Sequence, residues 1–216
     1  MKKPNKQSIS KLQLILTVVF VVSLLISNVI TAKQVLLPFD IVMTGAVIVF
    51  PITYILSDLF SEIYGYAWSR FTCYIAFAMN LFMVLVFELV ITTPAPEFWN
   101  NQEAFQTVLG STPRILFASL TAFVVGDLVN DRVFRRMKKK YPDSHKGFGL
   151  RAIVSSLCGE VIDSAIFLPI AFIGQMPMKA LFMMMVVQVS IKTAYEIVIL
   201  PVTKYIVKKV SAYELN

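Results

Sequence analysis

The sequence has little charge for its length. Charged residues make up 15% of the 216 residues, whereas hydrophobic residues make up 57%. A soluble domain has about 25% charged and about 45–50% apolar residues, and a chain of this length has too little interior to bury the excess. The composition therefore argues against a soluble enzyme and against a disordered chain, and it predicts an integral membrane protein.

Cysteine and histidine are too scarce to suggest a disulfide framework or a zinc site. Cys73 and Cys158 lie far apart in apolar stretches, and the one histidine, His145, lies in a charged loop. Zinc sites are built from clustered cysteine and histidine side chains, so we predict neither a metal nor a cofactor. The sequence also lacks a GxxxxGK[ST] motif, so it has no nucleotide site of that kind.

Six apolar runs have lengths suited to crossing about 30 Å of hydrocarbon. The first, residues 12–32, contains no charged side chain and is longer than the apolar core of a signal peptide. We expect an all-α integral membrane protein, with six transmembrane helices forming one transport domain over residues 1–216. The predicted helices span about residues 12–32, 41–58, 71–92, 115–134, 152–174 and 180–207. A short interfacial helix is expected at residues 103–109.

The positive charges are distributed unevenly among the loops. With both termini in the cytoplasm, sixteen of the twenty lysines and arginines lie on the cytoplasmic side and three on the outer side. Cytoplasmic loops of membrane proteins carry such an excess, so we predict cytoplasmic termini. Residues 132–151 alone carry a net charge of +7, equal to that of the whole chain. We attribute this charge to topology beside anionic lipid and predict no nucleic-acid partner.

Charged side chains also fall near the middle of the fifth and sixth predicted helices. Counted at about 1.5 Å per residue, Glu160 and Asp163 are central in helix five and share one face. Lys192 is central in helix six, with Gln188 one turn before it and Glu196 one turn after it. Charges inside a bilayer are expensive, so we expect a functional site here. An internal ion pair of Lys192 with one of these acids is the structural alternative.

Helices one and two add further candidates. Pro51 is expected to bend helix two and to free a backbone carbonyl, while Asp58 and Glu62 lie one turn apart near its inner end. Asp127, by contrast, falls toward the inner end of helix four, where an ordinary interfacial charge is expected. The residues predicted to bind substrate are Asn28, Tyr54, Asp58, Glu62, Glu160, Asp163, Phe167, Gln188, Lys192, Tyr195 and Glu196.

Two blocks of the sequence are distinctive. Helix two contains FPITYILSD at residues 50–58 and EIYGY at residues 62–66, and helix five contains GEVIDS at residues 159–164. With these blocks the chain resembles the queuosine precursor transporter family, also called the vitamin uptake transporter family, over about residues 12–210. The resemblance implies a six-helix importer in the bacterial inner membrane. It would carry 7-deazaguanines such as preQ0, preQ1 or queuine, for salvage of the modified tRNA base queuosine.

The resemblance and the charges suggest how a ligand would be held. A 7-deazaguanine is flat and presents an N–H and an amino group side by side, which Glu160 or Asp163 would accept as charge-assisted hydrogen bonds. Candidates to bond the carbonyl side are Asn28, Gln188 and Lys192, and candidates to stack on the ring are Tyr54, Phe167 and Tyr195. The partners expected are this substrate and the lipid bilayer, with protons and a second copy of the chain as open alternatives.

Two other functions stay open at the level of the sequence. A six-helix chain without a nucleotide site would also suit the substrate-binding subunit of an ATP-driven vitamin-type importer, with the ATPase acting in trans. Paired acids on a helix would also suit an intramembrane enzyme. Since no histidine lies at depth and no nucleophile–histidine arrangement is present, we predict no catalytic residues and no enzyme.

Overall fold

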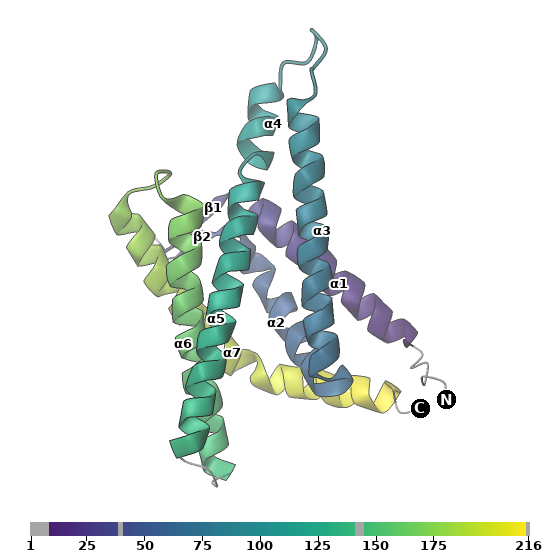
Figure 1. Cartoon of the computed structure of the whole chain (residues 1–216), viewed down its shortest axis with the longest axis vertical. Helices are drawn as coiled ribbons and strands as arrows, with labels where there is room; N and C mark the ends of the chain where they lie inside the picture. Colours follow the sequence, from purple (N-terminus) through teal and green to yellow (C-terminus); the bar gives the residue numbers. More distant parts are fainter. Residues whose placement is uncertain (1–8, 39–40, 141–144, 215–216) are drawn as a thin grey trace.

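The computed structural model describes residues 9–38, 41–140 and 145–214, and these are largely helical (Figure 1). The chain begins with helix α1, a two-stranded hairpin and a short helical segment. Their bounds are α1 Lys11–Ile30, β1 Gln34–Leu37, β2 Ile41–Thr44, the 3-10 turn η2 Gly45–Ile48, α2 Phe50–Leu59 and the π-helical turn η3 Phe60–Tyr64. The remaining helices are α3 Tyr66–Thr92, α4 Gln102–Leu109, α5 Thr112–Lys140, α6 His145–Phe172 and α7 Met178–Glu214.

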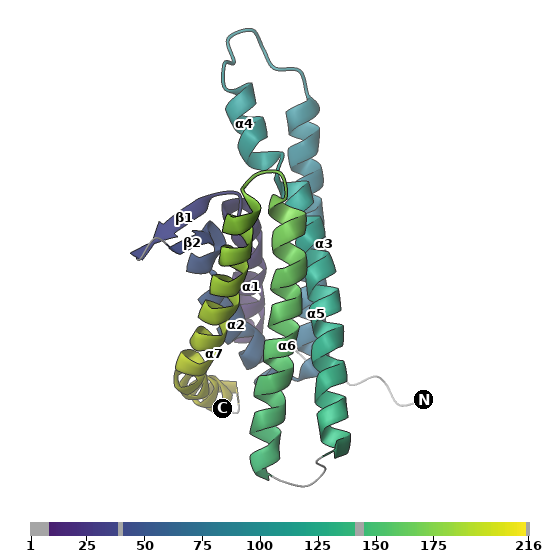
Figure 2. The same ribbon diagram turned by 90° about the vertical axis from the view of Figure 1, so that its left-hand side faces the viewer.

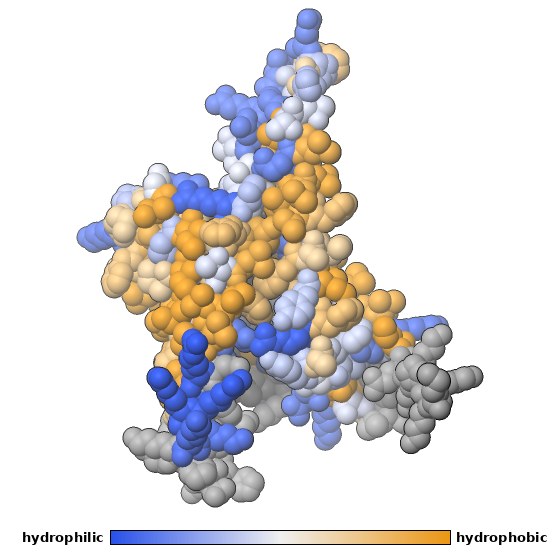
Figure 3. Space-filling view, in the orientation of Figure 1, coloured by the Kyte–Doolittle hydropathy of each residue, from blue (hydrophilic) through white to orange (hydrophobic). Residues whose placement is uncertain are grey.

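Among the described residues, four stretches are long and apolar enough to cross a membrane. They are α1, α3, the segment Gln102–Lys139 that contains α4 and most of α5, and Val154–Phe172 of α6. Apolar side chains form a broad band over the middle of the molecule, with hydrophilic residues toward both ends (Figure 3). The prediction of an all-α multi-pass membrane protein is thus confirmed at this level, while six spans and the orientation of the termini stay predictions.

The second predicted helix, residues 41–58, is wrong in its first half. Residues 41–44 form β2, which pairs antiparallel with β1 so that Leu37 lies opposite Ile41 and Gln34 opposite Thr44. The helix α2 begins only at Phe50, with Pro51 in its first turn, where a missing N–H breaks no helical hydrogen bond. Pro51 therefore starts a helix and does not bend one.

The other helices agree more closely with the sequence. The capping box between Ser10 and Gln13 starts α1, because each side chain accepts a hydrogen bond from the other residue's backbone N–H. The short helix expected at residues 103–109 is α4. Gly65 lies between the α2–η3 segment and α3 and has a φ of 84°, which glycine adopts readily. The chain changes direction there before α3 begins.

The last helix, α7, changes direction along its length. It descends beside α6 and then runs across the lower half of the molecule, above the lower ends of α5 and α6 (Figures 1 and 2). Pro201 lies inside α7, and a proline removes one backbone donor and commonly kinks a helix. The start of α1 and the end of α7 lie at the end of the molecule toward which α5 carries its basic last turns (Figure 1). The exposed cations of those turns are Arg132, Arg135, Arg136, Lys138 and Lys139.

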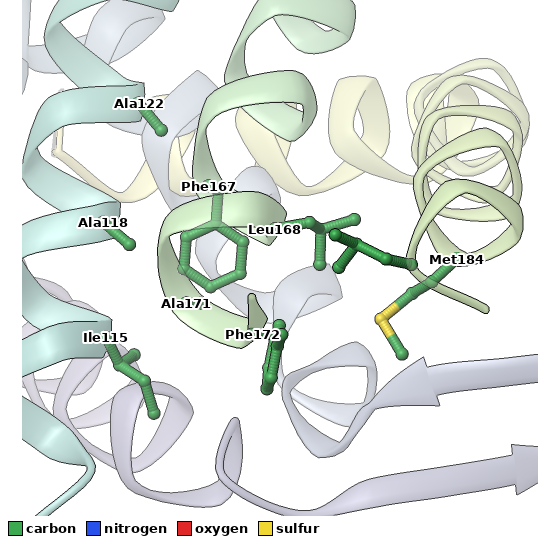
Figure 4. Close-up of a cluster of buried hydrophobic side chains, with 9 residues drawn as sticks. Ile115, Ala118, Ala122, Phe167, Leu168, Ala171, Phe172 and Met184 are labelled. Atoms are coloured by element: carbon green, nitrogen blue, oxygen red, sulfur yellow. The ribbon is translucent and has the colours of Figure 1, made fainter. Parts of the chain in front are cut away.

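Two apolar clusters hold the helices together. The first joins α5, α6 and α7, with Ile115 and Ala118 facing Phe167 and Phe172, whose rings meet edge to face at 6.4 Å (Figure 4). The second joins α1, α2, η3 and α3 through residues that include Phe20, Leu56, Leu59, Phe60 and Ala76, with apolar residues of the last part of α7 packed against them. Each cluster lies at the edge of the site described below.

Among the described helices, α5 and α6 share the most extensive contact, and two glycines lie in it. A Cβ on Gly126 would lie 3.1 Å from the carbonyl oxygen of Gly159 and 3.3 Å from Cβ of Asp163. A Cβ on Gly159 would lie 3.1 Å from Cβ of Asn130. Such contacts are tighter than ordinary van der Waals distances, so a side chain at either position requires the neighbouring atoms to shift by a few tenths of an ångström.

Replacing Gly159 by leucine is therefore expected to destabilise the protein by about 2 kcal/mol, because an overpacked site must shift its backbone. We expect ligand binding to weaken as well, since the shift falls in the α5–α6 interface, where Gly126 meets both Gly159 and Asp163. Thermal unfolding in detergent measures the first effect. Val161→Leu, at an exposed position of the same helix, is the control. Equal unfolding temperatures for Gly159→Leu and wild type would contradict the close contact.

Candidate functional site

A cavity of about 420 Å³ lies inside the bundle, and we call it the central cavity. Its walls come from α1, α2, α3, α5, α6 and α7, and it shares Phe167 with the first apolar cluster and Phe20 with the second. Seven of the eleven predicted site residues line it: Asn28, Tyr54, Glu160, Asp163, Phe167, Gln188 and Lys192. The structure thus brings together residues that are up to 164 positions apart in the sequence.

The charged groups of α6 and α7 meet on one side of the central cavity. The Nζ atom of Lys192 lies 3.0 Å from Oδ2 of Asp163, and the exposed fractions of the two side chains are 8% and 28%. Glu160, almost one turn before Asp163, accepts a hydrogen bond of 3.1 Å from the hydroxyl of Thr193. The ion pair that the sequence left as the structural alternative is present, with Asp163 as the partner. Two acids and one lysine thus meet on this wall of the cavity.

Gln188 contributes an amide to the same wall. Its side chain is 1% exposed, and among the described residues its Oε1 atom has no hydrogen-bond partner. A buried polar atom without a partner is unfavourable by about 1–3 kcal/mol. Gln188 lines the central cavity, so its side chain borders the space that a polar ligand would occupy.

Asn28 belongs to a second polar group on the wall formed by α1, α3 and α5. Its Nδ2 atom donates to Oδ1 of Asn80 over 2.6 Å, and its Oδ1 accepts from the hydroxyl of Ser119 over 3.4 Å. Asn80 is fully buried, and sequence reasoning missed it. The available signal was an amide in the middle of an otherwise apolar span.

Asp127 also lines the central cavity, contrary to the expectation of an ordinary interfacial charge. Its carboxylate lies 2.7 Å from the guanidinium of Arg70 on α3. Arg70 donates a second hydrogen bond, of 2.6 Å, to the hydroxyl of Tyr66. Depth along one helix placed Asp127 near the boundary, but only the packing of α3 against α5 gives it a partner. The ion pair therefore joins two helices at the edge of the cavity.

The charge of each partner can be exchanged to test this ion pair. Arg70→Asp and Asp127→Arg are each expected to lower stability by about 1 kcal/mol, a modest effect because both side chains are about one third exposed. The double variant is expected to recover much of that loss, as measured by thermal unfolding of all four proteins. Additive losses in the double variant would show that the two side chains do not interact.

Four predicted residues lie elsewhere or outside the description. Asp58 and Glu62 are exposed and do not line the central cavity. Tyr195 lines a neighbouring hollow of about 50 Å³, whose wall also includes Tyr54 and Lys192. The side chain of Glu196 lies outside the part of the chain that the structure describes. Within that part, no three histidine, cysteine, aspartate or glutamate residues come together in a way that could hold a metal ion.

Membrane-spanning helices around a polar, charged cavity are the architecture of a membrane transporter. A family model described as "Putative vitamin uptake transporter" matches residues 44–206. The chain belongs to this vitamin uptake transporter family, whose description is that of transporters and not of enzymes.

A curated relative supports the same family. The chain is 26% identical over 145 residues to a protein of Bacillus subtilis (strain 168) named "Probable queuosine precursor transporter". The match covers 67% of this chain and 63% of the relative, so it spans less than two thirds of that protein's length. No solved structure matches this chain.

Proposed function

We propose that this chain is an importer of queuosine precursors, that is, of 7-deazaguanines such as preQ0, preQ1 or queuine. The observation that carries the proposal is the central cavity, where Glu160, Asp163, Gln188 and Lys192 converge within a membrane bundle. A flat, polar heterocycle needs both acceptors and donors along its edges, and this set supplies both. The printed name of the Bacillus subtilis relative points to the same class of substrate.

The ligand would lie between the charged wall and the aromatic side chains. Glu160 would accept the paired N–H and amino group, because a carboxylate accepts two parallel hydrogen bonds. Lys192 and the Gln188 amide would bond the carbonyl side. Tyr54 or Phe167 would stack on the ring. Asp58, Glu62 and Tyr195, which lie away from the central cavity, have no role in this proposal.

The setting of the proposed importer is the bacterial inner membrane, with six spans in a single domain and both termini in the cytoplasm. The basic end of α5, the start of α1 and the end of α7 lie toward the same end of the molecule, which supports a common cytoplasmic side (Figure 1). Access to the cavity would alternate between the two sides of the membrane, as in other secondary transporters. Protons are a candidate coupling ion because carboxylates, among them Glu160 and Asp163, line the cavity.

Uptake in cells tests the proposal. A strain that cannot synthesise or import queuosine precursors would express the chain, and queuosine in its tRNA would be measured after addition of each 7-deazaguanine. We expect queuosine to return with at least one precursor in wild type and not in Glu160→Gln. Absence of queuosine with every precursor, in cells where the protein is present in the membrane, would refute the proposed function. Repeating the assay with a collapsed proton gradient would test coupling.

A further inference from the structure

A chain of buried amides connects the wall of the central cavity to the backbone of α3. Asn80 is fully buried, and its Nδ2 atom donates to the carbonyl oxygen of Ala76 over 3.1 Å. Asn28, which is 7% exposed and lines the cavity, donates its own Nδ2 to Oδ1 of Asn80 over 2.6 Å. The orientation of the Asn80 amide therefore determines the orientation of the Asn28 amide.

The carbonyl of Ala76 sets the direction of this chain. A backbone carbonyl oxygen can only accept, so Asn80 must turn its NH2 group toward Ala76 and present Oδ1 on the other side. That oxygen can only accept from the NH2 group of Asn28. The remaining atom of the Asn28 amide, Oδ1, is then held where Ser119 reaches it at 3.4 Å.

The Oδ1 atom of Asn28 keeps capacity for a further hydrogen bond. An amide oxygen has two lone pairs, and the described contact to Ser119 uses one of them over a distance well above the usual 2.7–2.8 Å of such bonds. Without Asn80, the Asn28 amide could turn by 180° and offer its NH2 group, because its two ends have nearly the same shape.

We infer that Asn80 is a positioning residue, which fixes Asn28 as a hydrogen-bond acceptor for an N–H group of the transported molecule. The identity of that molecule as a 7-deazaguanine rests on the proposed function, whereas the orientation of Asn28 does not. The assigned role differs from the sequence-based expectation that Asn28 donates to a carbonyl group. Asn80 itself does not line the central cavity. It acts on specificity through Asn28.

The first test compares ligands. Purified wild type, Asn80→Leu and Thr72→Val would be titrated with a 7-deazaguanine and with analogues methylated on one nitrogen each. Thr72 is a buried residue on α3 that is not part of the amide chain, so Thr72→Val controls for a change of buried polarity. In wild type, one analogue is expected to bind at least about tenfold more weakly than the parent, because it lacks the N–H that Asn28 accepts.

In Asn80→Leu the parent is expected to lose about tenfold to a hundredfold in affinity, while that analogue loses little. Discrimination between the two ligands should therefore disappear, and Thr72→Val should keep it. A merely structural role of Asn80 would weaken both ligands by the same factor, and this result would overturn the inference.

The second test needs no ligand. Hydrogen exchange of the Asn28 side-chain NH2 group would be followed by NMR on protein labelled with 15N-asparagine, with the signal assigned by its loss in Asn28→Ser. We expect protection in wild type and at least about tenfold faster exchange in Asn80→Leu. Equal exchange in both proteins would overturn the inference. If wild type binds no 7-deazaguanine, the proposed function is refuted. The exchange result would still decide the role of Asn80.

Discussion

Lys192→Met is expected to reduce uptake of a 7-deazaguanine at least about a hundredfold. The substitution removes the Nζ group that lies 3.0 Å from Asp163, and it leaves that carboxylate on the wall of the cavity without its cation. We expect a loss of stability of about 2 kcal/mol, below the full value for a buried pair because 28% of the Asp163 side chain is exposed. Lys192 would also no longer donate to the carbonyl side of the ligand.

A second variant separates these two effects. Lys192→Met combined with Asp163→Asn removes both charges, so the unfolding temperature is expected to return most of the way to that of wild type. Uptake is expected to stay lost, because neither charge is available to the ligand. Initial uptake rates in proteoliposomes and thermal unfolding in detergent measure the two quantities. Normal transport by the double variant would mean that the ion pair serves the fold alone.

Glu160→Gln is expected to weaken binding of a 7-deazaguanine by about a hundredfold while changing stability little. An amide oxygen still accepts the hydroxyl of Thr193, so the contact that holds the side chain survives. The amide cannot accept two parallel hydrogen bonds from the ligand, however, because its NH2 group faces one of the ligand donors. Binding should therefore fall without unfolding.

Calorimetric titration of purified protein measures this effect. Glu103→Gln, an exposed position on α4, makes the same chemical change away from the central cavity and is expected to bind like wild type. Thr193→Val is expected to have an intermediate effect, since Glu160 loses one of the contacts that orient it. An affinity of Glu160→Gln within about twofold of wild type would remove Glu160 from the site.

The depth of charges along predicted helices identified much of the site. Glu160, Asp163 and Lys192 are central in runs that are otherwise apolar. Charged side chains inside a bilayer are unfavourable, so their positions can be recognised from the sequence alone. Asp127 was assigned to the interface because one helix gives depth but not neighbours. Its partner Arg70 is 57 positions away, and only the packing of α3 on α5 brings them together.

The hairpin and the amide chain show two further limits of prediction. Residues 41–48 form an apolar run that suits a buried strand as well as a helix. Pairing with residues 34–37 makes residues 41–44 a strand, and residues 45–48 follow as a 3-10 turn. Asn80 is a neutral amide with no motif around it. Its importance depends on a 2.6 Å contact to Asn28 from a different helix, which no periodicity reveals. The local sequence pattern thus predicts helices and strands and the depth of charged residues in the membrane. It does not predict which side chains of different helices contact each other.

The central claim is that the transported molecule occupies the central cavity, and Cys73 offers the most direct measurement. Cys73 lines the cavity and Cys158 does not. The Cys158→Ser variant keeps only Cys73 and therefore reports on the cavity, whereas the Cys73→Ser variant keeps only Cys158 and serves as the control. The measurement is the rate of thiol alkylation with and without a saturating 7-deazaguanine. We predict at least about tenfold slower alkylation of Cys73 with ligand and an unchanged rate for Cys158. An unchanged rate for Cys73 in protein that binds the ligand would contradict the account.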